Sequence, residues 1–155
     1  MADYRDLFGE DLRLLPFLDT LHSNRDPGND LAVAPSPDGY DLATLAGTDN
    51  LVQALVLRLL TPAGALAPLG HPSYGSRLHE LIGELNNATN RNRVKMFALQ
   101  ALTAEPRVRE VLSLDVVPAR DDRTRVDVTA SLATIEGAAP LNLVFPFSFE
   151  EGATG

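Results

Sequence analysis

The sequence predicts an α+β fold, in which a block of about three helices packs on a small antiparallel sheet and an N-terminal arm comes first. Three observations indicate this class. Apolar residues repeat at helical spacing between residues 48 and 105, and beyond Arg107 they recur at every second position. A chain of 155 residues with 45% hydrophobic content is also large enough to bury one core.

The arm is predicted to occupy residues 1–29. Apolar residues are dense there, but Pro16 interrupts any long helix. The run Asp26-Pro27-Gly28-Asn29-Asp30 is a strong turn signal and separates the arm from a single domain at 30–150. We expect the arm to pack along the domain or onto a neighbour, and residues 151–155 to form a disordered tail.

The domain is predicted to open with a hairpin of residues 31–35 and 40–45. Pro37-Asp38-Gly39 supplies the turn chemistry between the two strands.

Three helices are predicted next. The first begins near Thr48 and buries a wide face: Leu51, Val52, Leu55, Val56, Leu59 and Leu60. The second, shorter helix begins near Ser76 and buries Leu78, Leu81, Ile82 and Leu85. The third is capped by Thr89, ends at Glu105-Pro106, and buries Val94, Phe97, Ala98, Ala101 and Leu102.

Three strands follow as an antiparallel meander, at 111–117, 126–132 and 141–149. Pro146 has no backbone N–H, so the last strand is predicted to lie at a sheet edge or to carry a bulge. Two interpretations stay open. The proline blunts an exposed edge against aggregation, or the edge receives a strand from another protein.

Composition limits the classes of partner and site that we expect. The formal net charge is −8, which removes the usual footprint for nucleic acid and favours a partner with basic patches. The chain has no cysteine and no apolar run long enough to span a membrane, so we expect neither a Cys-based metal site nor a membrane partner. The acidic start does not resemble a signal peptide, and we expect synthesis in the cytoplasm.

Few residues stand in a pattern typical of a catalytic site. A zinc protease needs His at i and i+4 on a helix, but Gly83 stands four residues after His79. Glu80 and Glu84 could form an acid/base pair for glycoside cleavage, yet the same spacing is typical of any exposed helix face. We therefore expect no enzyme activity and no cofactor.

A small basic cluster, Arg91, Arg93 and Lys95, stands at the start of the third helix, where cations oppose the helix dipole. It is either a solvated face or a contact for an acidic partner.

A series of short motifs resembles the baseplate wedge and sheath-initiator family of contractile phage tails, type VI secretion baseplates and related injection systems. The series runs from Gln53-Ala54-Leu55 and Arg58-Leu59-Leu60-Thr61 through Gly70-His71-Pro72-Ser73-Tyr74-Gly75-Ser76-Arg77-Leu78 and Gly83-Glu84. It continues with Asn90-Arg91 and the family's short Glu-Pro-Arg motif, Glu105-Pro106-Arg107, and covers residues 30–150 in all.

The resemblance implies a structural role in assembly. Members link the baseplate wedge or core to the first sheath ring, so it implies sheath and wedge proteins as partners, with tube or spike hub proteins as further candidates. Several copies in a symmetric ring are expected. Glu105, Pro106 and Arg107 are implied to dock on the wedge core, with Tyr74, Arg77 and Arg91 as further partner-binding residues.

The last strand is implied to pair with the sheath by strand sharing, through Leu141, Leu143, Phe145, Pro146 and Phe147. Part of the same family carries a lysozyme-like label. A peptidoglycan hydrolase of the same machine is therefore the alternative function.

Overall fold

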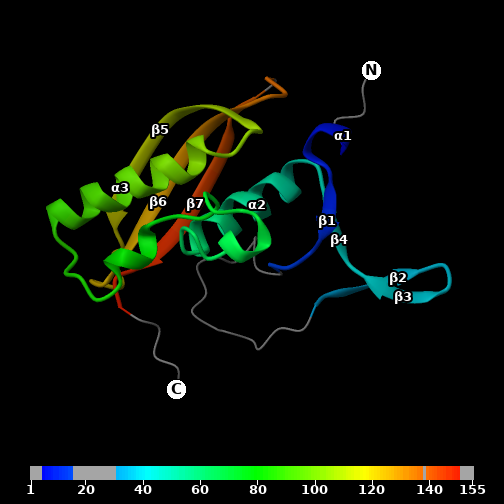
Figure 1. Cartoon of the computed structure of the whole chain (residues 1–155), viewed down its shortest axis with the longest axis horizontal. Coiled ribbons are helices and arrows are strands. Elements are labelled where there is room, and N and C mark those ends of the chain that lie inside the picture. The colour runs from blue at the N-terminus through cyan, green and yellow to red at the C-terminus, as the bar shows by residue number, and fades with distance from the viewer. Residues whose placement is uncertain (1–4, 16–30, 138, 151–155) are drawn as a thin grey trace. The chain divides into compact units, whose positions relative to one another are not determined.

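The computed structural model describes residues 5–15, 31–137 and 139–150, and the chain divides into two compact units, Met1–Ala54 and Leu55–Gly155 (Figure 1). Of the predicted arm at residues 1–29, residues 5–15 are described, while residues 1–4 and 16–29 lie outside the described residues, as does the tail at 151–155. The α+β class is confirmed, with two long helices and several small antiparallel sheets.

The first unit holds a short helix and two small sheets. Its elements are α1 (Arg5–Phe8), β1 (Glu10–Leu12), β2 (Val33–Ser36), β3 (Gly39–Leu42), β4 (Thr44–Ala46) and the start of α2 (Thr48–Leu60). β2 and β3 form the predicted hairpin, with Gly39 at φ 133° in its turn. The second predicted strand ends early, because residues 44–46 pair with β1 instead.

Buried amides of α2 hold the chain around β1 in place. The Gln53 side chain is 1% exposed; its oxygen accepts from Leu14 and Leu15 N–H, and its nitrogen donates to the Leu12 carbonyl at 2.8 Å. Asn50 donates to the Phe8 carbonyl at 2.9 Å. These bonds satisfy backbone groups that β1 alone leaves unpaired.

The second unit contains a helix-covered sheet. After the end of α2 come the 3₁₀ helices η1 (Ala67–Leu69) and η2 (Leu78–Leu81), then α3 (Ala88–Thr103), β5 (Val108–Pro118), β6 (Arg125–Thr134) and β7 (Leu141–Ser148). The predicted meander is confirmed, with strand order β5-β6-β7. α3 lies across one face of this sheet and packs most closely on β5 (Figure 1).

Alternation along the strands builds the core. The face toward α3 carries the buried side chains Leu114, Val126, Val128, Ala130, Leu132, Leu143, Phe145 and Phe147, and α3 contributes Val94, Phe97, Ala98, Ala101 and Leu102 as predicted. Residues of the opposite sheet face, such as Thr129 and Val144, are exposed. The sheet is therefore covered on one side, as the period-2 pattern indicates.

The predicted second helix is wrong. Only one turn of 3₁₀ helix forms, and while Leu78 and Leu81 are buried, Ile82 and Leu85 are 44% and 78% exposed. The physical reason is Gly83, which adopts φ 93° and donates its N–H to the carbonyl of Phe149 at 2.6 Å instead of continuing a helix.

The cap of the third helix is also two residues from its predicted position. Asn87, not Thr89, is the N-cap, and its side chain accepts from the Asn90 N–H at 2.8 Å. Among the described residues, no helix has the length and apolar character needed to cross a membrane.

Candidate partner-docking surface

The Glu-Pro-Arg turn lies between α3 and β5, and its three side chains differ in exposure. Pro106 is exposed, Arg107 is partly buried, and Glu105 is only 4% exposed. The Glu105 carboxylate accepts from Arg107 Nε at 2.6 Å and from Arg58 Nη2 at 3.2 Å. Glu105 therefore orders the turn from inside the protein, and the surface available to a partner consists of Pro106 and the outer part of Arg107.

Arg58 joins this turn to the loop at residues 70–77. It comes from the last turn of α2 and is 9% exposed, and its guanidinium carbon lies 4.5 Å from the centroid of the Tyr74 ring. Its Nε has no hydrogen-bond partner within the described part of the chain. The buried Arg58 charge is thus stabilised by a cation–π contact with Tyr74 in addition to its ion pair with Glu105.

The charges of this cluster set the titration of two groups. Burial raises the pKa of Glu105, but its hydrogen bond and ion pair with Arg107, together with the charge of Arg58, outweigh burial and lower the pKa below the ordinary 4.5. Burial raises the pKa of the Tyr74 phenol, against the opposing charge of Arg58. Glu105 is therefore ionised at neutral pH, and Tyr74 is protonated.

The loop carrying Tyr74 is fixed by backbone packing. Ser76 forms a parallel bridge with Pro62, donates its N–H to the Thr61 carbonyl at 2.8 Å, and donates its hydroxyl to the Leu59 carbonyl at 2.6 Å. Gly75 adopts φ 108°, and a Cβ there would lie 2.5 Å from the Thr61 oxygen. Only glycine fits this close approach.

Arg77 and Arg91 lie outside the Arg58 cluster. Arg77 donates twice to Glu80, at 2.7 and 2.9 Å, and its guanidinium lies 4.6 Å from the Phe97 ring, with its side chain half exposed. Arg91 donates to the carbonyl and the side-chain oxygen of Asn86. Arg91, one member of the predicted basic cluster, therefore already donates to local acceptors.

β7 is an edge strand. The proline predicted either an edge position or a bulge for this strand, and the edge position is the one observed. Its register with β6 runs from Leu141 to Ser148 without a shift, so β7 carries no bulge. The side chains of Leu143, Phe145 and Phe147 belong to the core. What the strand can offer a partner is its backbone together with the outward residues.

The hydrogen-bond alternation identifies which backbone groups are available. Just beyond β7, Phe149 donates to the Thr124 carbonyl at 2.8 Å, so odd-numbered residues bond toward β6. The even-numbered ones, Asn142, Val144, Pro146 and Ser148, then direct their backbone groups to the free edge. Pro146 fits this arrangement, because its missing N–H costs the β6–β7 ladder nothing.

The two edges of the sheet differ in protection. β5 has two register shifts and carries Arg109, Glu110 and Asp115. β7 contains no charged residue over its eight positions. Charges and bulges, two of the usual means of keeping an edge from pairing, are present on β5 and absent from β7, where Pro146 is the feature that hinders pairing.

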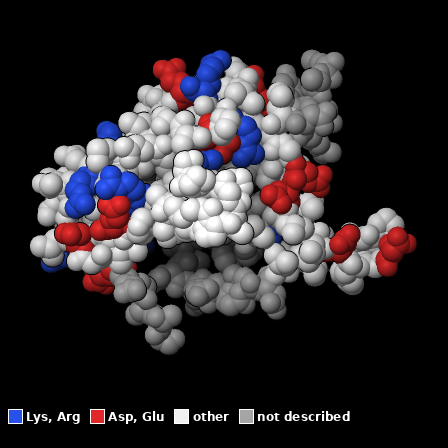
Figure 2. All heavy atoms as spheres, in the orientation of Figure 1, with Lys and Arg blue, Asp and Glu red and all other residues white. Residues whose placement is uncertain are grey.

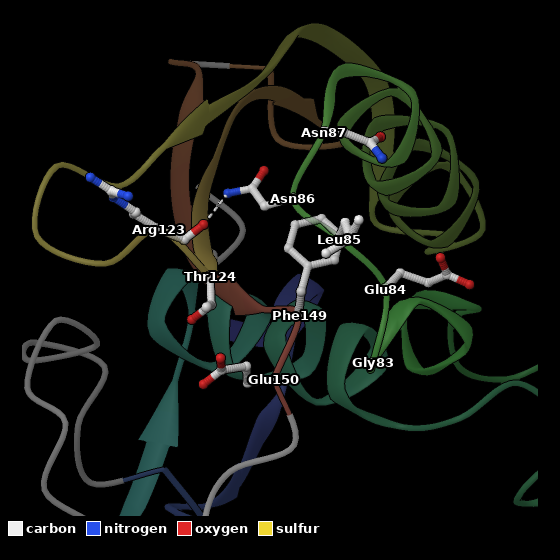
Figure 3. Close-up of a pocket in the computed structure, with 9 residues that line it drawn as sticks. All are labelled: Gly83, Glu84, Leu85, Asn86, Asn87, Arg123, Thr124, Phe149 and Glu150. Atoms are coloured by element: carbon white, nitrogen blue, oxygen red, sulfur yellow. Dashed lines mark hydrogen bonds between the residues drawn. The ribbon is translucent and has the colours of Figure 1, made fainter.

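A hollow in the second unit was not predicted from the sequence. It has a volume of about 720 Å³ and is lined by residues 83–87, Arg123, Thr124, Phe149 and Glu150 (Figure 3). Asn86 closes one side by donating to the Arg123 carbonyl at 2.8 Å. Its residues are brought together by the Gly83–Phe149 bond, which no local pattern indicates.

The carboxylates considered for glycoside cleavage, Glu80 and Glu84, do not share a helix. Glu80 lies in η2, whereas Glu84 follows Gly83 and lines the hollow, with its side chain directed away from Glu150 (Figure 3). Glu80 is held by Arg77, whose hydrogen bond lowers the pKa of that carboxyl. A general acid needs a raised pKa, so the shift at Glu80 is in the unhelpful direction. Within the described residues, no group of three His, Asp or Glu could hold a metal ion.

Comparisons with known proteins identify the fold. No family model and no curated protein matches the chain. Among solved structures, a crystal structure from Geobacter sulfurreducens, provisionally named a tail lysozyme, matches with a TM-score of 0.57 and 24% identity, over 68% of this chain and 93% of that one. The chain therefore shares the fold of this tail-associated protein over two thirds of its length.

Proposed function

We propose that this protein is a non-enzymatic baseplate component of a contractile, phage-tail-like injection machine. In this proposal it links the baseplate wedge or core to the first sheath ring and starts sheath assembly by receiving a sheath strand. The observation that carries the proposal is the edge of β7, which has eight uncharged residues in unbroken register and lacks an N–H at Pro146. The fold shared with a protein named for a phage tail supports the same class of machine.

Strand addition fits the chemistry of this edge. A partner strand beside β7 would meet the N–H groups of Asn142, Val144 and Ser148, and their carbonyls together with that of Pro146. Main-chain bonds would supply affinity that does not depend on the partner's side chains. A symmetric ring of copies would then present one such edge per copy.

The second contact is proposed at the Glu-Pro-Arg turn. Arg107 is oriented by the buried Glu105 carboxylate, and Pro106 stands exposed beside it. This arrangement preorganises a guanidinium for an acidic group on the wedge core. In this proposal Glu105 positions Arg107, and Arg107 makes the contact with the partner.

A proline at Val144 tests the strand-sharing proposal. Val144→Pro removes an N–H directed to the free edge and leaves the bonds to β6 in place. Expressed in place of the native protein, it should cut the number of sheathed particles in electron micrographs at least tenfold, while the purified variant keeps its far-UV circular dichroism. Val144→Thr, which keeps the N–H and a similar shape, is the matched control.

Normal numbers of sheathed particles with Val144→Pro would overturn strand sharing at β7. An equal loss with Val144→Thr would mean that the side chain, not the backbone, carries the contact. The turn is tested separately by Arg107→Lys, which keeps a cation beside the buried Glu105 carboxylate but loses the planar guanidinium, and which should block assembly while the protein stays folded by circular dichroism.

The alternative function is a peptidoglycan hydrolase, favoured by the name of the Geobacter protein. It requires that the isolated protein clear purified cell walls, and that Glu84→Gln or Glu80→Gln abolish the clearing. Absence of clearing at high protein concentration would remove this alternative.

A further inference from the structure

The β2–β3 hairpin carries all its large apolar side chains on one face. Val33 pairs directly with Leu42, and Pro35 with Tyr40, so these four side chains share a face of the ribbon. The other face holds Ala34, Ser36, Gly39 and Asp41. We call the first set, Val33, Pro35, Tyr40 and Leu42, the hairpin face.

The hairpin face has no cover among the described residues. Val33 is 64% exposed, Tyr40 is 80% exposed and Leu42 is 40% exposed. Within residues 5–15, 31–137 and 139–150 this sheet has two strands, and such a hairpin is marginally stable unless one face packs against something else. An exposed aromatic among aliphatic neighbours is typical of an interface anchor.

The surrounding charge indicates what covers it. The described residues of the first unit, 5–15 and 31–54, contain six Asp and Glu against two Arg. Residues 31–54 hold Asp38, Asp41 and Asp49 and no Lys or Arg. Acidic groups but no basic ones therefore appear on the hairpin (Figure 2). Such a surface repels nucleic acid and anionic lipid and attracts a basic protein surface.

We propose that the hairpin face docks on a partner protein whose contact surface is apolar at its centre and rimmed by Lys or Arg. Tyr40 is the anchor of this contact, and Asp38, in the turn between the two strands, meets the basic rim. The contact is separate from the β7 edge and does not depend on strand sharing.

Site-specific photocrosslinking in the producing cell tests this inference. p-Benzoylphenylalanine is placed at Tyr40 in the full chain and, as matched control, at Asp41 on the opposite face of the same strand. Crosslinked peptides are mapped by mass spectrometry. We expect at least fivefold more product from position 40, concentrated on one partner segment that contains apolar residues flanked by Lys or Arg.

Equal yields from the two faces, no product, crosslinks to acidic segments, or crosslinks only to this chain or a second copy of it would each overturn the proposal. Tyr40→Ser gives an independent measurement in the complex identified by the crosslink. Retention of that partner should fall at least tenfold at 50 mM NaCl, and raising NaCl to 500 mM should weaken the native complex as well. Ser36→Ala, on the opposite face, should leave retention unchanged.

Discussion

Removal of the Glu105 carboxylate should destabilise the protein far more than a surface change would. Glu105→Ala leaves Arg58 buried at 9% exposure. Its Nη2 loses an acceptor, and its Nε already has no hydrogen-bond partner among the residues that the structure describes. Breaking a buried ion pair from one side costs about 3–5 kcal/mol. Arg107 is a quarter exposed and regains water, so we expect the lower end, about 3 kcal/mol.

Urea unfolding followed by circular dichroism measures this loss. The midpoint should fall with an unchanged m-value, which assigns the loss to the native state. The double change Arg58→Met with Glu105→Leu, which replaces the pair by apolar groups, should recover at least half of the loss. A loss below about 0.5 kcal/mol for Glu105→Ala, the range of ordinary surface substitutions, would refute the view that Glu105 holds a buried charge.

Three further predictions concern the same cluster and the loop beside it. Because the pKa of Glu105 is lowered in the folded state, its ionised form stabilises the protein above pH 4.5, and this contribution is lost as pH falls. The difference in unfolding free energy between the native protein and Glu105→Gln should therefore shrink between pH 7 and pH 3.5. A constant difference would contradict the lowered pKa. Gly75→Ala should lower the free energy of unfolding by more than about 2 kcal/mol, because its Cβ would meet the Thr61 and Pro62 oxygens at 2.5 and 2.8 Å. Gly70→Ala, with nothing within 4 Å of its Cβ, should lower it by about 1 kcal/mol. Equal thermal midpoints for the two variants would contradict the close approach at Gly75. Tyr74→Leu should lose about 1 kcal/mol of cation–π contact with Arg58 while Tyr74→Phe stays close to the native protein in urea unfolding, and equal losses would assign the effect to the phenol oxygen instead.

The pattern of apolar residues predicted the parts of the fold that local periodicity controls. α2, α3, the hairpin and the three-stranded meander all follow from spacing and turn chemistry. The predicted second helix failed because the course of the chain at Gly83 is decided by a bond to Phe149, 66 positions further along. β1 and β4 were missed for a similar reason, since Glu10 pairs with Ala46 across the intervening hairpin.

The candidate site was predictable in part. The motif resemblance pointed to Tyr74, Glu105 and Arg107 as separate residues. The structure brings them together through Arg58, a charged residue in an otherwise apolar helical face. A sequence pattern does not show that Glu105 is buried, and therefore did not distinguish a positioning residue from a contact residue. The edge position of β7, in contrast, followed from one residue, Pro146.

The most direct test of strand sharing is a cryo-electron microscopy map of the baseplate and first sheath ring in an assembled particle containing this protein. We predict a strand of a sheath subunit beside β7, with main-chain hydrogen bonds to Asn142, Val144 and Ser148 and a missing bond at Pro146. A β7 edge that faces solvent, or that is covered by side chains without main-chain pairing, would contradict the proposal.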